Sequence, residues 1–159
     1  MSDLPDTYHV AVGRLTLAAA TMEVLIGELA QAAGAPTDAV AFLSSSGMSG
    51  GALQMLQTAG AQLPAESEIN SLHRDASALL IERDALVHAV TMHDLRPESG
   101  TPADELIDTV ETVPAAPLPG VEQLDDLVER MHALSAQALG VTRLASQGVV
   151  DPITTEDQL

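Results

Sequence analysis

Apolar residues recur every three or four positions along three long stretches of the chain, with polar residues between them. From about Tyr8 to Ala33 they are Leu15, Ala19, Met22, Ile26 and Leu29. From about Val121 to Gln147 they are Leu124, Leu127, Met131, Leu134, Ala138, Val141 and Ala145. This spacing is typical of one buried face of an α-helix. Each such helix needs other helices to cover its apolar face.

The remaining stretch, from about Glu66 to Thr91, has the same spacing with one polar member. Its positions are Ile69, Leu72, Ala76, Leu80, Arg83, Val87 and Val90. Arg83 therefore falls on the apolar face of the predicted helix. Three helices with one apolar face each predict a common core. We expect an all-α helical bundle of four to five helices.

Glycine and proline divide the rest of the chain. Gly34 and Pro36 are expected to end the first helix, and a short helix is expected from Pro36 to Leu43. A Ser/Gly loop over 44–51 leads to a short helix at 52–62, capped by Ser49, with Leu53 and Leu56 pointing inward. Pro64 ends that helix.

The segment 94–120 is rich in proline and forms an irregular excursion before the last long helix. A strand is possible from Val110 to Val113, paired with residues near Met92. We expect a flexible N-terminus over 1–7, a single bundle domain over 8–147 and a flexible acidic tail over 148–159.

Composition narrows the function classes. The chain has 23 acidic residues against six arginines, a net charge of −17 and no cysteine. Disulfides and thiolate metal sites are thereby excluded. The charge repels nucleic acids and anionic membranes and suits a basic protein partner. No uninterrupted apolar run reaches membrane length and no signal-peptide pattern is visible, so we expect a cytoplasmic protein without a membrane segment.

Candidate chemistry lies late in the second long helix, at Arg83, Asp84 and His88. Asp84 and His88 are four residues apart, so they share a helix face. Arg83 and His88 are five apart, about 140° around the helix. A second copy of the helix would bring an arginine and a histidine together more easily. Histidine titrates near neutral pH, and arginine suits a charged phosphoryl transition state.

The Arg83-to-His88 segment resembles the R-x4-H motif of HEPN-type helical proteins, many of which are metal-independent ribonucleases. The resemblance covers roughly residues 8–147 and implies a homodimer that pairs through the motif-bearing face. It also implies a composite RNA site and a role as a toxin or defence component. His88 would then act on a ribose 2′-hydroxyl, Arg83 would stabilise the phosphorane, and Asp84 would orient one of them.

This sequence departs from the active pattern, because Glu82 and Asp84 flank Arg83 and aromatic stacking platforms are nearly absent. The alternative is a non-catalytic acidic helical protein-interaction module. Arg83 would then form a buried ion pair with Glu23 or Glu28, and His88 would be a satisfied core histidine. If that pair is fully buried, Arg83→Ala should cost roughly 3–5 kcal/mol.

No cofactor or metal site is expected. Glu129 and His132 have the spacing found in di-iron bundles, but such a site needs a second copy of the motif and further carboxylates. His88 and His93 are five apart, which is a poor spacing for chelation on one helix face.

Overall fold

The computed structural model describes residues 4–35, 51–61, 63–64, 67–94 and 117–146. Helix α1 spans Asp6–Ala32, α3 spans Gly51–Gly60, α4 spans Glu68–Asp94 and α5 spans Val121–Ser146. Within these ranges every regular element is a helix and no strand occurs. The protein is an all-α helical bundle, as the apolar stripes predict.

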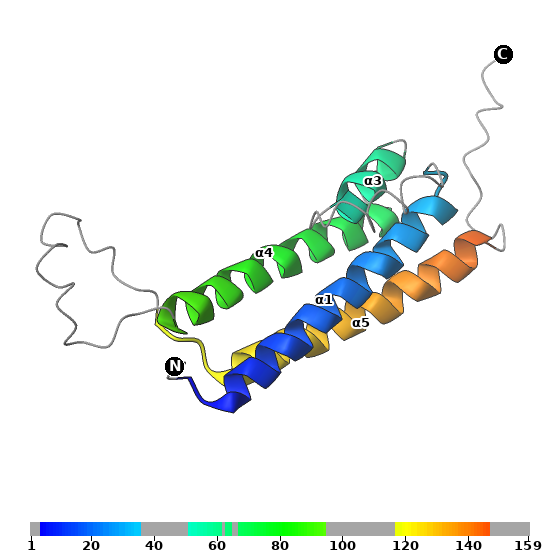
Figure 1. Ribbon diagram of the computed structural model, residues 1–159. Helices are drawn as coiled ribbons and strands as arrows, with labels where there is room; N and C mark the ends of the chain where they lie inside the picture. The colour runs from blue at the N-terminus through cyan, green and yellow to red at the C-terminus, as the bar shows by residue number, and fades with distance from the viewer. Residues whose placement is uncertain (1–3, 36–50, 62, 65–66, 95–116, 147–159) are drawn as a thin grey trace, which may run out of the picture.

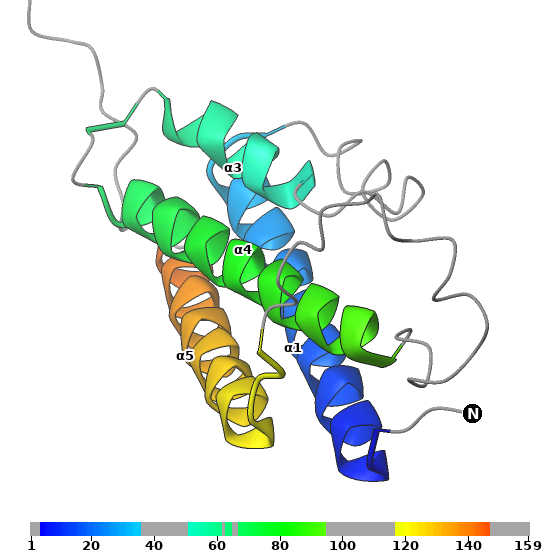
Figure 2. The ribbon, with the colours of Figure 1, turned by 90° about the vertical axis from the view of Figure 1, so that its left-hand side faces the viewer.

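The three long helices lie side by side, and the short helix α3 packs over one end of α1 and α4 (Figure 1; Figure 2). Helices α1 and α5 run in the same direction and make the most extensive contact in the bundle. The Tyr8 hydroxyl donates to the Pro119 carbonyl at 3.0 Å, which joins the start of α1 to the residues before α5. Helix α4 runs antiparallel to both (Figure 1).

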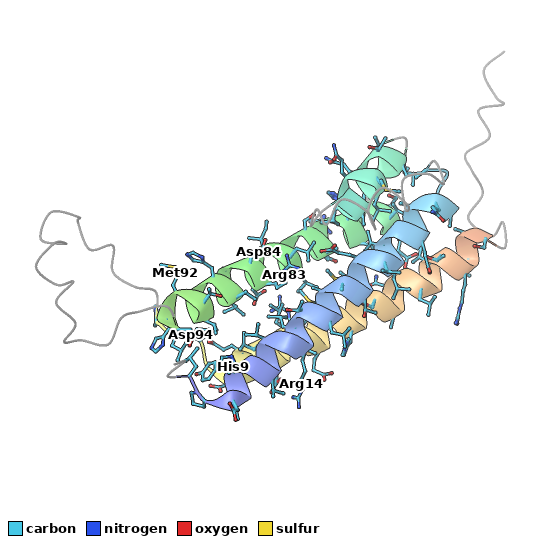
Figure 3. The ribbon with its side chains drawn as sticks, viewed as in Figure 1. His9, Arg14, Arg83, Asp84, Met92 and Asp94 are labelled. Carbon is cyan, nitrogen blue, oxygen red and sulfur yellow. The ribbon has the colours of Figure 1, made fainter. Side chains whose placement is uncertain are left out.

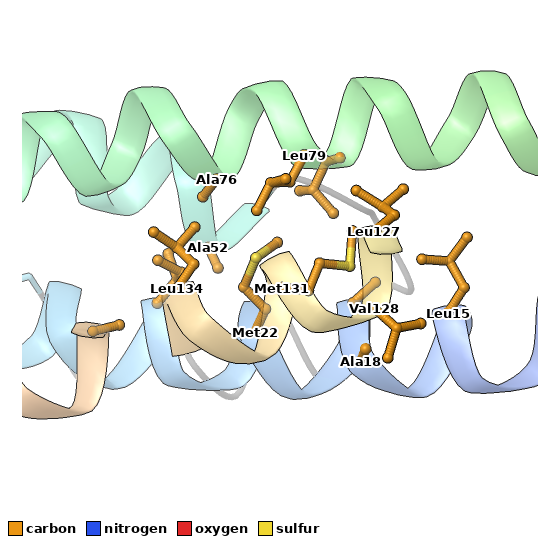
Figure 4. Close-up of a cluster of buried hydrophobic side chains, with 14 of the residues drawn as sticks. Leu15, Ala18, Met22, Ala52, Ala76, Leu79, Leu127, Val128, Met131 and Leu134 are labelled. Atoms are coloured by element: carbon orange, nitrogen blue, oxygen red, sulfur yellow. The ribbon is translucent and has the colours of Figure 1, made fainter. Parts of the chain in front are cut away.

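The core lies where α1, α4 and α5 face one another (Figure 4). The largest fully buried side chains are Leu15, Met22, Ile26, Leu29, Leu56, Leu72, Leu124, Leu127 and Met131. Buried alanines, such as Ala18 and Ala76, let the helix backbones approach closely. Each large apolar side chain removed from water contributes about 1.5–3 kcal/mol to stability. Most positions of the predicted stripes therefore lie in the core, whereas Val87 and Ala145 are only partly buried.

Helix α1 ends at a glycine, as predicted. Gly34 has φ +102°, a conformation that favours glycine. Its N–H donates to the Gln31 carbonyl at 2.9 Å, and the Ala35 N–H donates to the Ala30 carbonyl at 2.9 Å. These two bonds form a Schellman motif that satisfies carbonyls at the helix end.

The start of α4 is fixed by two polar side chains. Ser67 Oγ accepts a hydrogen bond from the Asn70 N–H at 3.3 Å, which caps the helix. The Asn70 side-chain amide donates to the carbonyls of Gly60 at 3.3 Å and Pro64 at 2.8 Å. Asn70 thus ties the end of α3 to the start of α4 and sets the register of the helix that carries the candidate site.

Two sequence expectations need correction. Leu4 is buried in the core and α1 begins at Asp6, so the ordered domain starts before residue 8. Met92 lies in α4, which continues to Asp94, so the residues up to Asp94 are helical and do not form a strand. The expected helix at 36–43, the Ser49 cap, the strand at 110–113 and the tail at 148–159 lie outside the described residues.

The apolar length of helix α1 bears on the expectation that the chain has no membrane segment. By length and composition it can cross a membrane, with a mean hydropathy of 1.5 in its most apolar window, of which 39% is buried in the bundle. Core helices of bundles and N-terminal signal sequences meet the same two criteria. Length and composition therefore do not distinguish among these roles.

Candidate functional site

Arg83 lies on the side of α4 that faces α1 (Figure 3). Its side chain is only 17% exposed, as its place in the apolar stripe predicts. Arg83 Nη1 lies 3.8 Å from Glu23 Oε1 of α1, and the Glu23 side chain is 24% exposed. The predicted ion pair with an acid of another helix is therefore present, and the acid is Glu23.

Asp84 provides a second carboxylate for the same guanidinium. Arg83 Nε and Nη2 both donate to Asp84 Oδ1, at 2.9 and 2.6 Å. Two donors on one carboxylate oxygen fix the plane of the guanidinium and hold it on its own helix. Asp84 is thereby engaged by Arg83 rather than by His88. Among the described residues no hydrogen bond joins Asp84 to His88.

His88 is exposed on α4, so the expectation of a core histidine is wrong. Arg83 points toward α1, about 140° around the helix from His88. The neighbours of His88 one turn away on α4 are Asp84, Ala85, Thr91 and Met92, and none is cationic. Within one copy of the chain, the structure does not bring the arginine and the histidine together.

Most arginines in the described residues form ion pairs with Asp or Glu side chains. Arg14 lies 3.4 Å from Asp125, Arg74 lies 3.7 Å from Asp75, and Arg130 contacts two carboxylates. An arginine already bound by carboxylates is a weak site for a phosphate, because the charges cancel locally. The described surface therefore lacks the arginine cluster that RNA binding would require in a chain of net charge −17.

A second polar site, which the sequence reasoning missed, lies in the groove between α4 and α5. Arg130 of α5 contacts Glu82 of α4 through both terminal nitrogens, at 2.9 and 2.8 Å. Asp126, one turn before Arg130, lies 3.7 Å away. The hydrogen bond to Glu82 is the main reason that the pKa of Arg130 is raised. The spacing of Asp126 and Arg130 was the only sequence signal for this site.

The same groove is open to solvent on both sides of this ion pair. One hollow, of about 380 Å³, is lined by Glu82, Leu86, Glu122, Gln123 and Asp126. The other, of about 340 Å³, is lined by Asp75, Ala78, Leu79, Arg130, Ala133, Leu134 and Gln137. Three of the five residues that line the first hollow are carboxylates, and one, Leu86, is apolar. This composition suits a basic group attached to an apolar stem.

The described part of the chain contains no cluster of side chains that could bind a metal ion. No group of three or more His, Asp or Glu side chains is placed there to hold a metal ion. Glu129 and His132 are both exposed on α5 and point away from the core.

No protein-family model, curated protein sequence or solved structure matches this chain. The resemblance to HEPN proteins therefore rests on Arg83, Asp84, His88 and the layout of the helices, and it remains a prediction.

Proposed function

We propose that this protein is a non-catalytic helical interaction module that binds a basic segment of another protein along its α4–α5 groove. The observation that carries the proposal is that two carboxylates already hold the guanidinium of Arg83. Its guanidinium lies between the carboxylates of Glu23 and Asp84, at 3.8 and 2.6 Å, on the side of α4 that faces α1. An arginine held in this way joins two helices and is not available to a phosphoryl group.

The chemistry of the groove supports a basic partner. Glu82, Glu122 and Asp126 line the hollow, and within the groove Arg130 is the cation that opposes them. A partner arginine or lysine would add attraction without displacing a buried group, because these acids are at least partly exposed. The net charge of −17 would increase the rate of encounter with such a partner. Leu86 offers an apolar contact for the stem of the basic side chain.

A pair of matched variants tests this proposal. Glu122 and Glu68 are both exposed acids in the first turn of a helix, but only Glu122 lines the groove. The probe is a synthetic helical peptide of arginine and leucine, titrated by calorimetry at low salt. Glu122→Gln should weaken binding by a factor of about three to ten, and Glu68→Gln should change it little. Equal effects of the two substitutions would show unspecific charge attraction and would refute the groove as the site.

One observation favours the competing function, a metal-independent ribonuclease built from two copies of the chain. His88 lies on an exposed face of α4 that also carries Ile81 and Met92, both exposed apolar side chains. Pairing of two such faces would bring two His88 side chains into one interface, as the HEPN resemblance implies. Even then each Arg83 would have to leave Glu23 before it could meet a phosphate. Cleavage of RNA that depends on His88 is the test of this function.

A further inference from the structure

Helix α1 has a second apolar face, directed away from the bundle. Val10, Leu17 and Val24 are large, exposed and spaced seven residues apart, so they form one line along the helix. Leu17 is 70% exposed. At 100° per residue this line lies about half a turn away from the buried Leu15 and Met22. The core of the bundle therefore leaves it uncovered.

Small residues alternate with the large ones on this face. Gly13 and Ala20, both exposed, lie three residues after Val10 and Leu17. No heavy atom lies within 4 Å of a Cβ built on Gly13, so the surface is open there. We call Val10, Gly13, Leu17, Ala20 and Val24 the α1 seam. Its steps of three and four residues are those of a helix that packs along a second helix.

The α1 seam is free of charge along its length. Arg14 and Glu28 flank the seam on one side, with Thr21 between them, and Asp6 lies one turn before Val10. A soluble surface in a chain of net charge −17 has no need of such a neutral strip. Charge depletion at the centre and charges at the rim are typical of a protein interface.

We propose that α1 is a dimerisation helix and that its seam packs antiparallel against the same seam of a second copy. In this arrangement Leu17 of each copy faces Ala20 of the other, and Val24 of each faces Gly13 of the other. Leu17 and Val24 thus each meet a small residue, and both copies use the same surface, as a two-fold interface requires. This inference goes beyond the binding of a basic segment and uses a different face of the molecule.

The charges at the rim fix the direction of packing. Helix side chains lean toward the helix N-terminus. In the antiparallel register Arg14 of one copy and Glu28 of the other therefore lean toward each other, once at each end of the seam. A parallel register would place Arg14 beside Arg14 and Glu28 beside Glu28. Arg14 retains 62% side-chain exposure beside Asp125, so it can serve this additional contact.

The expected dimer is weak. The seam from Val10 to Val24 spans 15 residues of helix, roughly 21 Å, and one helix pair of this length buries less than a standard protein interface. We therefore expect a reversible dimer whose population depends on protein concentration. The exposed face of α4 around Ile81 is the natural comparison, because the HEPN resemblance would place the dimer there.

Two variants in the seam and one matched control test the proposal by analytical ultracentrifugation over a concentration series. Gly13→Leu fills the space beside Gly13 that receives Val24 of the other copy in the proposed dimer. Within one copy the new Cβ meets no atom, and leucine favours the helix more than glycine does. Leu17→Glu places a charge at the centre of the seam. Ile81→Glu is the control, because Ile81 is 71% exposed, matching Leu17, but lies on α4.

The wild type and Ile81→Glu should form the dimer, whereas Gly13→Leu and Leu17→Glu should raise its dissociation constant at least about tenfold. Gly13→Leu should melt no lower than the wild type in dilute solution, which separates lost pairing from lost folding. A wild type that is monomeric throughout, or a dimer lost only in Ile81→Glu, would overturn the proposal. Binding of the wild type, but not of Leu17→Glu, to phosphatidylcholine vesicles would also overturn it, because the face would then be a lipid-binding surface.

Discussion

Two arginines, Arg83 and Arg130, each join a pair of helices through two carboxylates, but they do so in opposite ways. Arg130 has the better geometry, with both terminal nitrogens within 2.9 Å of Glu82, whereas Arg83 lies 3.8 Å from Glu23. Arg83 is the more buried of the two: its side chain is 17% exposed, and that of Arg130 is 46% exposed. Water and salt screen the exposed pair far more than the sheltered one.

Burial, rather than the distance between the charged atoms, decides how much each ion pair matters to the stability of the fold. An exposed ion pair contributes about 0–1 kcal/mol even when its geometry is good. A sheltered pair contributes little to stability as a pair, but removing one member leaves a carboxylate poorly solvated. Arg83 is therefore a structural connection between α1 and α4. The Arg130–Glu82 pair is exposed and weak, so its side chains can rearrange at little cost if the proposed partner binds in the groove.

The largest effect is expected from Arg83→Ala, which should lower the free energy of unfolding by about 1–3 kcal/mol. This is less than the 3–5 kcal/mol for a fully buried pair, because Glu23 keeps 24% of its side-chain exposure and can recover some water. Urea denaturation followed by circular dichroism measures it. Arg143→Ala removes the same charge from an exposed position of α5 and should cost less than about 0.5 kcal/mol.

A double-mutant cycle with Glu23→Gln sharpens the assignment of that loss. If Arg83 acts through Glu23, the two substitutions together should cost less than the sum of the single ones, with a coupling of about 0.5–1.5 kcal/mol. The control cycle pairs Arg83→Ala with Glu28→Gln, since Glu28 is exposed on the other side of α1. If Arg83 couples to Glu28 as strongly as to Glu23, the loss of stability does not come from the ion pair between Arg83 and Glu23.

Arg130→Ala is expected to cost at most about 1 kcal/mol, because both members of the Arg130–Glu82 pair are nearly half exposed. Repeating the denaturation at high salt should remove most of this cost and leave that of Arg83→Ala largely intact. If the two variants lose stability equally and respond equally to salt, burial does not distinguish the two sites.

The smallest effect on stability is expected from His88→Ala. His88 is exposed and has no hydrogen bond within the described residues, so the change in the free energy of unfolding should lie within about 0.5 kcal/mol. Thermal denaturation at pH 7 measures it. A large loss would show that His88 supports the fold, for example through residues outside the described ranges.

Much of this fold is predictable from the sequence because a 3.6-residue period leaves a clear trace. The stripes through Leu15, Leu72 and Met131 become the core, and the ends of the long helices differ from the expected ones by at most three residues. The sheltered position of Arg83 follows from the same period. Fold class and core depend on local spacing, and spacing is visible in one sequence.

The choice between Glu23 and Glu28 could not be predicted, because it depends on where α4 crosses α1. The pair between Arg130 and Glu82 joins residues 48 apart in sequence and depends on the register of two helices. Leu4 is buried in the core although it precedes the first helix, so no helical period marks it. A search for one apolar stripe per helix also overlooks the second stripe of α1. The candidate sites depend on contacts between helices, and a single sequence predicts the helices but not these contacts.

An RNA cleavage assay in EDTA with the wild type and His88→Ala decides between a structural and a catalytic Arg83. Because Arg83 is held by Glu23 and Asp84 and lies far around the helix from His88, we predict that neither protein cleaves any of several RNAs. His88→Ala should keep the fold of the wild type, so the comparison is clean. Cleavage by the wild type that is lost in His88→Ala would contradict the account and establish a metal-independent nuclease.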